Sequence, residues 1–293
     1  MTPFTVIGVP IDSVGRAGGT EHAPAQLRVL GLVGALGARE GGDLDVRIRG
    51  EERDPDTGLL ASPDVMTATR AIRDAVAASV AAGERPFLIG GCCAELPGAL
   101  AGARDVIGRV GLAYVDGHLD MYDGLSSPTG EAADMPVAVA LGFGPGGWVD
   151  VCGGASVDGP DVAILGFRDL DQSLDDGMRD PSSILGLKLA DVDTVRSAPA
   201  ELGARIAGEL SDGPGRFWLH LDVDVLDEAV FPATDYLFPG GLGWNELIAM
   251  LSPLVSSPGL LGASIGCYNP EKDPGWRNGT ELVEAFRTAA RSA

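Results

Sequence analysis

Short apolar segments alternate with alanine-rich segments along the whole chain, and this alternation constrains the fold most strongly. Several of the apolar segments are continuous runs, which is typical of strands covered by helices on both faces. We expect strands at residues 5–9, 44–48, 86–89, 110–115, 162–165, 183–187, 217–222 and 259–265. We expect helices at residues 23–32, 63–82, 96–103, 132–141, 192–210, 244–254 and 280–291. The pattern predicts a three-layer α-β-α sandwich with a mainly parallel, roughly eight-stranded sheet, in a single domain over residues 1–293.

Two acidic stretches, about a hundred residues apart, follow predicted strands. Asp116, His118 and Asp120 come after one strand, and Asp222 and Asp224 end another. Side chains on a strand repeat every two residues, so each stretch points its polar groups to one face. Four carboxylates and an imidazole beside apolar strands require neutralising cations. The sequence therefore predicts a divalent metal site, with two ions, beyond the carboxyl ends of the strands.

Charge and cysteine usage narrow the class of protein. The formal net charge of −21 disfavours nucleic acid and anionic membranes as partners, because both attract basic patches, and it is compatible with a cationic small-molecule substrate or simply with high solubility. We find no apolar run near the length of a membrane span and no signal peptide. Four cysteines, two of them adjacent at Cys92 and Cys93, do not form a disulfide pattern, so we expect a reduced, cytoplasmic protein. Monomer and homo-oligomer both stay open.

Several motifs resemble those of the arginase–agmatinase (ureohydrolase) family. Residues 116–120 look like its Asp-Ala-His-x-Asp box, and residues 220–227 look like its Ser-x-Asp-x-Asp-x-x-Asp-Pro box. Cys92 and Cys93 stand where the family has Asp-His, and residues 166–171 resemble its Gly-x-Arg-Asp-x-Asp segment. Further similar segments follow in the family's order at residues 7–10, 23–28, 231–234, 240–242 and 268–270. The resemblance covers nearly the whole chain and implies an arginase-like fold.

The resemblance also implies two manganese ions and a reaction. The implied ligands of one ion are Cys93, Asp116, Asp120 and Asp222, and those of the other are Asp116, His118, Asp222 and Asp224. In this family a hydroxide held between the ions attacks a guanidino-type carbon, which gives urea or an analogue and an amine. Asp120 would hold that hydroxide and pass its proton to the leaving nitrogen, as a general base and then a general acid.

Cys93 is the first departure from the family pattern, because it replaces a histidine ligand. A thiolate still binds a divalent ion, but it shifts the preference toward softer metals, so Zn²⁺ or Fe²⁺ becomes possible. The alternative is that Cys93 is a small buried residue and one metal is lost or loosely held. Cys92 is expected to pack in the interior.

Further departures concern the proton path and the substrate. Ala133 stands where the family has a proton-shuttling histidine, and Cys267 stands where arginase has a glutamate that pairs with the guanidinium. Glu131 occupies the place of a substrate-contacting asparagine, while Asp171 matches the residue that meets the substrate's α-amino group. We expect Glu131, Asp171, Tyr236 and Cys267 to contact the substrate.

These departures predict an amidinohydrolase that prefers a less basic guanidine to L-arginine. An N-hydroxyguanidine such as Nω-hydroxy-L-arginine fits, and the ureohydrolase-like enzyme of cycloserine biosynthesis looks similar in its departures. Two alternatives stay open: hydrolysis of another amidine or amide C–N bond in secondary metabolism, or a non-catalytic metal-binding member. We expect Tyr122 and Tyr236 to form pocket walls, and His22 and His220 to be structural.

Overall fold

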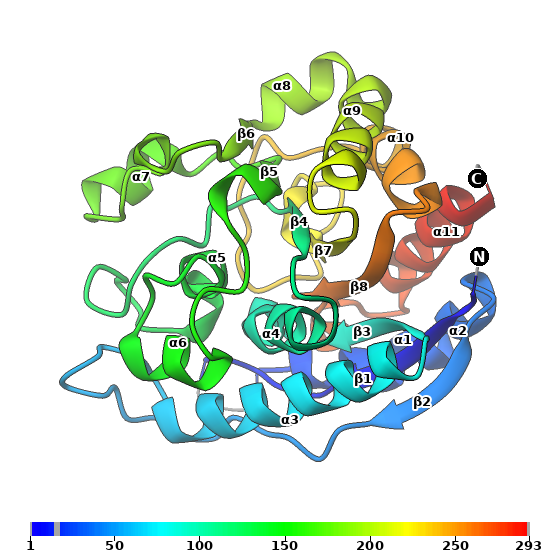
Figure 1. Ribbon diagram of the computed structural model, residues 1–293. Helices are drawn as coiled ribbons and strands as arrows, with labels where there is room; N and C mark the ends of the chain where they lie inside the picture. Colours follow the sequence, from blue (N-terminus) through cyan, green and yellow to red (C-terminus); the bar gives the residue numbers. More distant parts are fainter. Residues whose placement is uncertain (1, 15–17, 292–293) are drawn as a thin grey trace.

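The computed structural model describes residues 2–14 and 18–291, which build one eight-stranded sheet (Figure 1). Every strand pairing is parallel, and the strand order is β2-β1-β3-β8-β7-β4-β5-β6. The strands are β1 (Phe4–Val9), β2 (Arg39–Asp43), β3 (Arg85–Gly90), β4 (Gly111–Val115), β5 (Val162–Leu165), β6 (Lys188–Ala190), β7 (Phe217–Asp222) and β8 (Leu260–Gly266). The predicted parallel sheet of about eight strands is confirmed.

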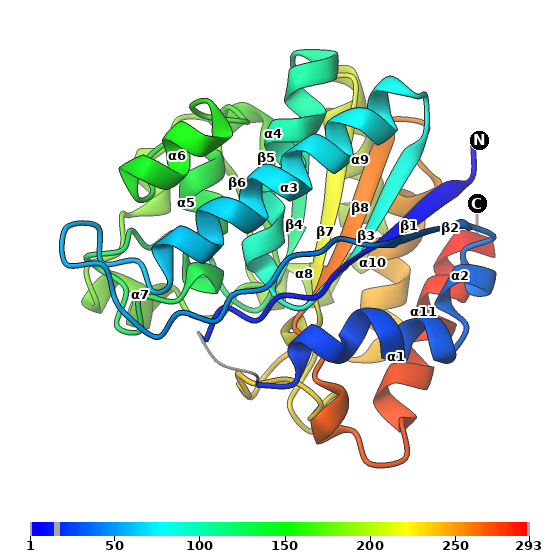
Figure 2. The same ribbon diagram turned by 90° about the horizontal axis from the view of Figure 1, so that it is seen from below.

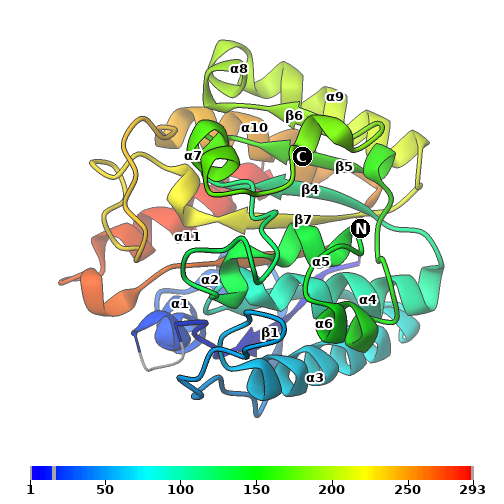
Figure 3. The same ribbon diagram turned by 90° about the vertical axis from the view of Figure 1, so that its left-hand side faces the viewer.

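Helices cover both faces of this sheet. They are α1 (Ala23–Val29), α2 (Leu32–Ala35), α3 (Ser62–Ala81), α4 (Leu96–Ile107), α5 (Pro136–Ala140), α6 (Gly146–Cys152), α7 (Leu170–Asp175), α8 (Val192–Ser197), α9 (Pro199–Asp212), α10 (Trp244–Ser256) and α11 (Arg277–Arg291). Figure 2 shows α3, α4 and α6 on one side of the strands and α1, α10 and α11 on the other. Figure 3 shows β4 and β7 between α4 on one side and α9 and α10 on the other. The predicted three-layer sandwich is therefore confirmed.

The central strands are buried along their whole length, as their apolar sequences predict. Every residue of β3, β4, β7 and β8 is buried. Helix α3 buries Val65, Ala68, Ile72 and Val76, whose spacing of three and four residues places them on one face. The core therefore lies on both faces of the middle of the sheet, and it fixes the strand ends that carry the acidic stretches.

The two edge strands differ from the prediction. β2 occupies Arg39–Asp43 instead of residues 44–48, and all five of its residues are exposed. β6 occupies Lys188–Ala190 instead of residues 183–187, because Gly186 adopts a φ of 79° and breaks the extended backbone before it. An edge strand pairs through its backbone on one side only, so apolar runs are a poor guide to its position.

Two predicted helices are divided by proline. The segment 192–210 forms α8 and α9, because Pro199 lacks an N–H and forces Ala198 out of the helical region, to φ −159° and ψ 64°. The segment 132–141 likewise forms a 3₁₀ turn at Ala132–Asp134 and then α5, which begins at Pro136. The predicted helices also do not include α6 and α7. No helix among residues 2–14 and 18–291 has the length and apolar character needed to cross a membrane.

Candidate active site

Four neighbouring strands deliver the site residues to one edge of the sheet. In the order β3-β8-β7-β4, the strand ends are followed by or contain Cys93, Cys267, Asp222 and Asp116. The register places Val115 opposite Leu221, and Asp222 opposite Gly266, so these four ends lie level with one another. Because all strands run in parallel, their carboxyl ends form one surface, where the sheet topology predicts a site.

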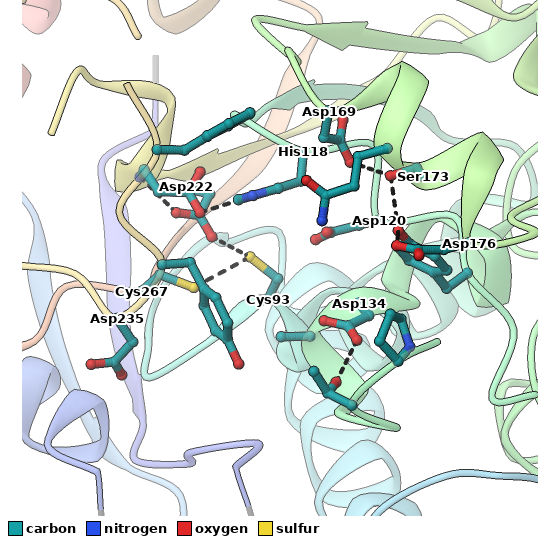
Figure 4. Close-up of a pocket in the computed structure, with 18 of the residues that line it drawn as sticks. Cys93, His118, Asp120, Asp134, Asp169, Ser173, Asp176, Asp222, Asp235 and Cys267 are labelled. Carbon is teal, nitrogen blue, oxygen red and sulfur yellow. Dashed lines mark hydrogen bonds and ion pairs between the residues drawn. The ribbon is translucent and has the colours of Figure 1, made fainter. Parts of the chain in front are cut away.

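A thiol-rich cluster lies at the β3, β8 and β7 ends (Figure 4). The Cys93 Sγ lies 2.8 Å from Asp222 Oδ2, 3.8 Å from Asp116 Oδ2 and 3.7 Å from the Cys267 Sγ. All four residues are buried, with Asp116 fully so. Sulfur and oxygen ligand atoms therefore converge on a small buried volume next to the cavity, which Cys93, Asp222 and Cys267 line.

A second cluster joins Asp116, His118 and Asp224. The His118 Nδ1 lies 3.1 Å from Asp224 Oδ2 and 3.6 Å from Asp116 Oδ1. Backbone amides fix the carboxylates: His118 N–H donates to Asp116, Gly117 N–H to Asp224, and Asp224 N–H to Asp222, at 2.7–3.1 Å. These bonds hold the acid groups in place before any cation binds.

Asp120 stands apart from both clusters, although it lines the same cavity. Its backbone has a φ of 48°, which is rare for a residue with a side chain. The Tyr114 hydroxyl donates a hydrogen bond to its carboxylate, and the Asp120 carbonyl accepts the Val137 N–H at 3.1 Å. The strained turn is thus held from both sides, which presents the carboxylate to the cavity.

The electrostatics of the metal-free site favour bound protons. Burial, and then the charge of Asp222, raises the pKa of Asp116 well above its usual range, and burial also raises the pKa of Asp120. The pKa of Asp222 is raised to about 7, chiefly by burial. Burial alone would raise the pKa of Asp224 and lower that of His118, but their ion pair reverses both shifts. Several carboxylates in one buried site repel one another when they are ionised, and bound divalent cations would offset this repulsion.

Both clusters fit divalent metal ions. The ligand atoms of Cys93, Asp222 and Cys267 lie within 4.8 Å of one another, as do those of Asp116, His118 and Asp224. Carboxylate, imidazole and thiolate are all common ligands of first-row divalent metals. Of the six predicted ligands, five belong to these groups, and Asp120 does not.

The clusters form the floor of a cavity of about 520 Å³. Among the described residues that line it there is no lysine or arginine. Its lining includes seven aspartates, namely Asp120, Asp134, Asp169, Asp176, Asp222, Asp224 and Asp235. Such a lining suits a cationic or hydrogen-bond-donating small molecule.

The predicted substrate contacts are placed as follows. Cys267 and Tyr236 line the cavity, and the Tyr236 hydroxyl donates a hydrogen bond to Glu131. Ala133, at the position of the family's shuttle histidine, also lines the cavity. Asp171 is exposed and does not line the cavity. The residues of α7 that line the cavity are Gln172 and Ser173. The expected place of Tyr122 and Tyr236 in the cavity wall is confirmed.

Sequence reasoning missed a polar wall on α7. The Ser173 hydroxyl donates to Asp169 Oδ2 at 2.7 Å, and the Tyr122 hydroxyl lies 3.0 Å from Ser173 Oγ and 3.1 Å from Asp176 Oδ2. The second carboxylate oxygen of Asp169 is buried without a partner. The high charge of residues 169–180 is typical of a solvated surface, and it therefore concealed the members of this stretch that are buried.

The sequence analysis also missed the role of Arg168, which connects the site to the loop that contains Phe238. Its Nη2 donates to the carbonyls of Asp224 and Phe238, both at 2.8 Å, and its guanidinium lies 5.0 Å from the Phe238 ring.

His22 is on the surface, 3.5 Å from Glu271, as a structural or solvent-exposed histidine would be. His220 is fully buried, and its Nε2 lies 3.2 Å from Cys93 Sγ. Its position two residues before Asp222 on a strand already implied a shared face.

Comparison with known proteins identifies the family. The model of the arginase family matches residues 2–289. The arginase of Bacillus caldovelox is 28% identical over 292 residues, covering 97% of this chain and 95% of that protein, and the arginase of Brevibacillus brevis is 26% identical over 277 residues, covering 92% and 91%.

The solved structures agree. The arginase structure from Bacillus caldovelox superposes with a TM-score of 0.87 at 26% identity, covering 99% of this chain and 98% of that one. The proclavaminate amidinohydrolase from Streptomyces clavuligerus shares the fold, with a TM-score of 0.69 at 19% identity, covering 100% and 93%. The expected arginase-like fold and family membership are thereby confirmed. The chain belongs to the arginase family, and it is a ureohydrolase-type hydrolase that acts on a C–N bond of a linear amidine.

Proposed function

We propose that this chain hydrolyses an N-substituted guanidine, and that an N-hydroxyguanidine such as Nω-hydroxy-L-arginine is favoured over L-arginine. The observation that carries the proposal is that Ala133 and Cys267 both line the cavity. At these two positions the cavity therefore offers no imidazole and no carboxylate. The same departures support a similarity to the Nω-hydroxy-L-arginine amidinohydrolase of cycloserine biosynthesis, and with it a role in secondary metabolism.

The preference follows from the basicity of the substrate. L-arginine carries a permanently charged guanidinium, which is held best by a carboxylate in a paired geometry. An N-hydroxyl group withdraws electrons and lowers the basicity of the guanidine, so the neutral form can bind without that carboxylate. Cys267 in place of glutamate is therefore tolerable for the hydroxylated substrate and unfavourable for L-arginine.

Enzymes of the arginase family use a binuclear manganese site, and we propose that Cys93, Asp116, His118, Asp120, Asp222 and Asp224 hold two divalent ions here. Mn²⁺ is the family's metal, while the Cys93 ligand makes Zn²⁺ or Fe²⁺ suitable as well. When bound, the two ions supply an activated water as the nucleophile and stabilise developing negative charge.

Asp120 is the residue that moves the proton in this proposal. It is buried, lines the cavity, and accepts a hydrogen bond from Tyr114, so its carboxylate is held in one orientation. It takes the proton from the attacking water and delivers it to the leaving nitrogen as the C–N bond breaks. The water oxygen bonds to the guanidino carbon, so the products are an amine and hydroxyurea from an N-hydroxyguanidine.

The rest of the cavity is proposed to bind the body of the substrate. Tyr236 and Glu131, which are joined by a hydrogen bond, form one wall, and we propose that both contact the substrate. Asp171 lies in the first turn of α7, next to the lining residue Gln172, and we propose that it meets a substrate amino group at the cavity mouth. We further propose that residues 1–293 act as one domain and that the protein is cytoplasmic, which the four free, buried thiols support.

A panel of substrates tests this function. Purified, metal-loaded protein is assayed with L-arginine, Nω-hydroxy-L-arginine and a formimino compound, and urea, hydroxyurea and formamide are measured separately. We expect kcat/KM for the hydroxylated substrate to exceed that for L-arginine by about 100-fold, the size of a lost acid–base contribution. A strong L-arginine rate overturns the preference. Ala133→His should raise the L-arginine rate, while Cys152→Ser, remote from the cavity lining, serves as the matched control.

A second candidate function is hydrolysis of another amidine or amide C–N bond. Cys267 favours it, because a neutral thiol imposes no charge requirement on the substrate. In the same panel, release of formamide without hydroxyurea identifies this activity.

A further inference from the structure

The two cysteines at the site are close neighbours in space. The Cys93 Sγ and Cys267 Sγ atoms lie 3.7 Å apart, although 174 residues separate them in the chain. Asp222 Oδ2 lies 2.8 Å from Cys93 Sγ, so a carboxylate faces the pair. All three ligand atoms lie within 4.8 Å of one another, which is the spacing of donors around a single ion.

The backbone around Cys267 is arranged to place its thiol there. Cys267 has a φ of 66°, in the left-handed region that residues with a side chain rarely adopt. Its N–H donates to the Gly91 carbonyl at 2.9 Å, which joins it to the segment that carries Cys93. The preceding residue is Gly266, where a Cβ atom would lie only 3.3 Å from the Cys93 Sγ. The chain therefore keeps space open beside the thiol of Cys93.

The surroundings of the thiol pair suit a bound cation. Both thiols are buried. A neutral imidazole closes the back of the cluster: His220 Nε2 lies 3.2 Å from Cys93 Sγ, and burial lowers the pKa of His220 to about 3. His220 Nδ1 is held 2.7 Å from Ser264 Oγ, which also accepts the Trp218 Nε1–H at 2.9 Å.

We propose that Cys267 is a metal ligand, and that Cys93, Cys267 and Asp222 form a two-thiolate site for a thiophilic divalent ion such as Zn²⁺. The inference deepens the proposed function and rests on it only in taking the site to hold metal. Cys267 then stands at the position of the family's guanidinium-pairing glutamate but serves as a metal ligand, and its substrate contact is secondary. The loss of a histidine at position 93 and of a glutamate at position 267 becomes a single change of coordination.

The proposal makes the two metal positions chemically different. The thiolate site offers two sulfurs and a carboxylate, a set that selects Zn²⁺ over Mn²⁺. The neighbouring group of Asp116, His118 and Asp224 offers oxygen and nitrogen donors, which suit Mn²⁺. With both metals supplied, the protein should bind one of each, whereas a pair of like sites would take two of the same.

Co²⁺ spectroscopy tests the ligand directly. Protein kept in reductant is titrated with Co²⁺, and sulfur-to-cobalt charge transfer is recorded in the near ultraviolet for wild type, Cys93→Ser and Cys267→Ser. We expect each substitution to remove about half of the band, since each removes one of two thiolates. Cys92→Ser is the matched control, because Cys92 is buried next to Cys93 but lies outside the ligand groups, and it should keep the full band. A full band in Cys267→Ser overturns the proposal.

X-ray absorption of wild type loaded with one equivalent of Zn²⁺ per chain needs no variant, so it decides the question even if Cys267→Ser does not fold. Two sulfur neighbours at about 2.3 Å support the site, and one or none overturns it. Neither measurement uses a substrate. Absence of hydrolysis across the panel would therefore count against the proposed function alone, whereas a spectrum independent of Cys267 counts against this inference alone.

Discussion

Removing the metal should reverse the pH dependence of stability between pH 7 and 8.5. Burial raises the pKa of Asp116 and Asp120 well above their usual range, and the pKa of His118 is also raised, by Asp224 and against the effect of burial. In the folded, metal-free protein these groups hold protons that the unfolded chain releases, from carboxyls near pH 4 and from histidine near pH 6.5. Groups whose pKa is raised in this way stabilise the folded protein at low pH, and this stabilisation is lost as the pH rises.

The magnitude follows from proton counting. Each proton held only by the folded state costs about 1.4 kcal/mol of stability per pH unit of increase. If the cluster holds at least one such proton, the metal-free protein loses about 2 kcal/mol between pH 7 and 8.5. For a chain of this size that is a fall in Tm of roughly 3 °C. His220, whose pKa is lowered to about 3, acts in the opposite sense, but only near and below pH 6.5.

The metal-loaded protein should behave in the opposite way. Metal binding needs deprotonated ligands, so affinity for the ion rises with pH and stabilises the folded state further. The measurement is thermal unfolding at pH 7.0, 7.5, 8.0 and 8.5, with chelator or with a fixed free Mn²⁺ concentration. Titration elsewhere in the protein affects both series equally, so the difference between the two slopes reports the site.

A metal-free Tm that is constant or rises over this range would refute the reasoning. It would mean that the carboxylates are already ionised in the empty site, and that burial is offset by water or by movement of the acid groups. Asp116→Asn separates these cases, since it removes one carboxylate from both clusters and should flatten the metal-free slope.

Three further predictions concern single residues. Asp120→Asn should lower kcat by about 10²–10⁴-fold, because an amide cannot accept the proton, and it should weaken binding of one of the two proposed ions, which elemental analysis measures; an unchanged kcat contradicts the proton-transfer role. Arg168→Met should lower the free energy of unfolding, measured in urea, by about 3 kcal/mol, because it removes two charge-assisted hydrogen bonds to carbonyls. The control is Arg179→Met: Arg179 is exposed and lies over the Phe143 ring, so this change should alter the free energy of unfolding by less than about 0.5 kcal/mol. Tyr236→Phe should raise KM about fivefold with kcat little changed, through the lost bond to Glu131; an unchanged KM contradicts a role in binding.

The sequence predicts the middle of this molecule better than its edges. Buried parallel strands such as β3 and β7 must be apolar on both faces, so their positions can be read directly. β2 is an exposed edge strand, and its Arg39–Asp43 sequence carries no such signal. The breaks at Pro136 and Pro199 were predictable from proline chemistry alone, because the residue before each proline leaves the helical region.

The site divides in a similar way. Residues within one stretch, such as Asp222 and Asp224, are related by strand periodicity, so their convergence follows from local spacing. Contacts between distant stretches depend on which strands are neighbours, and the chain order does not reveal that β8 lies between β3 and β7. For this reason the contacts of Arg168 and the contact between Cys93 and Cys267 were not predictable.

The strand order also changes how the departures from the family should be interpreted. Cys93 and Cys267 follow adjacent strands, β3 and β8, and their sulfurs touch, whereas Asp116, His118 and Asp224 follow β4 and β7 on the other side. Random loss of function would scatter substitutions over both halves of the site. Instead, one half keeps its oxygen and nitrogen donors, and in the other a histidine and a glutamate of the family are replaced together by thiols. This division is expected if the metal preference has changed at one position only, because a thiolate ligand changes the preferred ion only at the position where it binds.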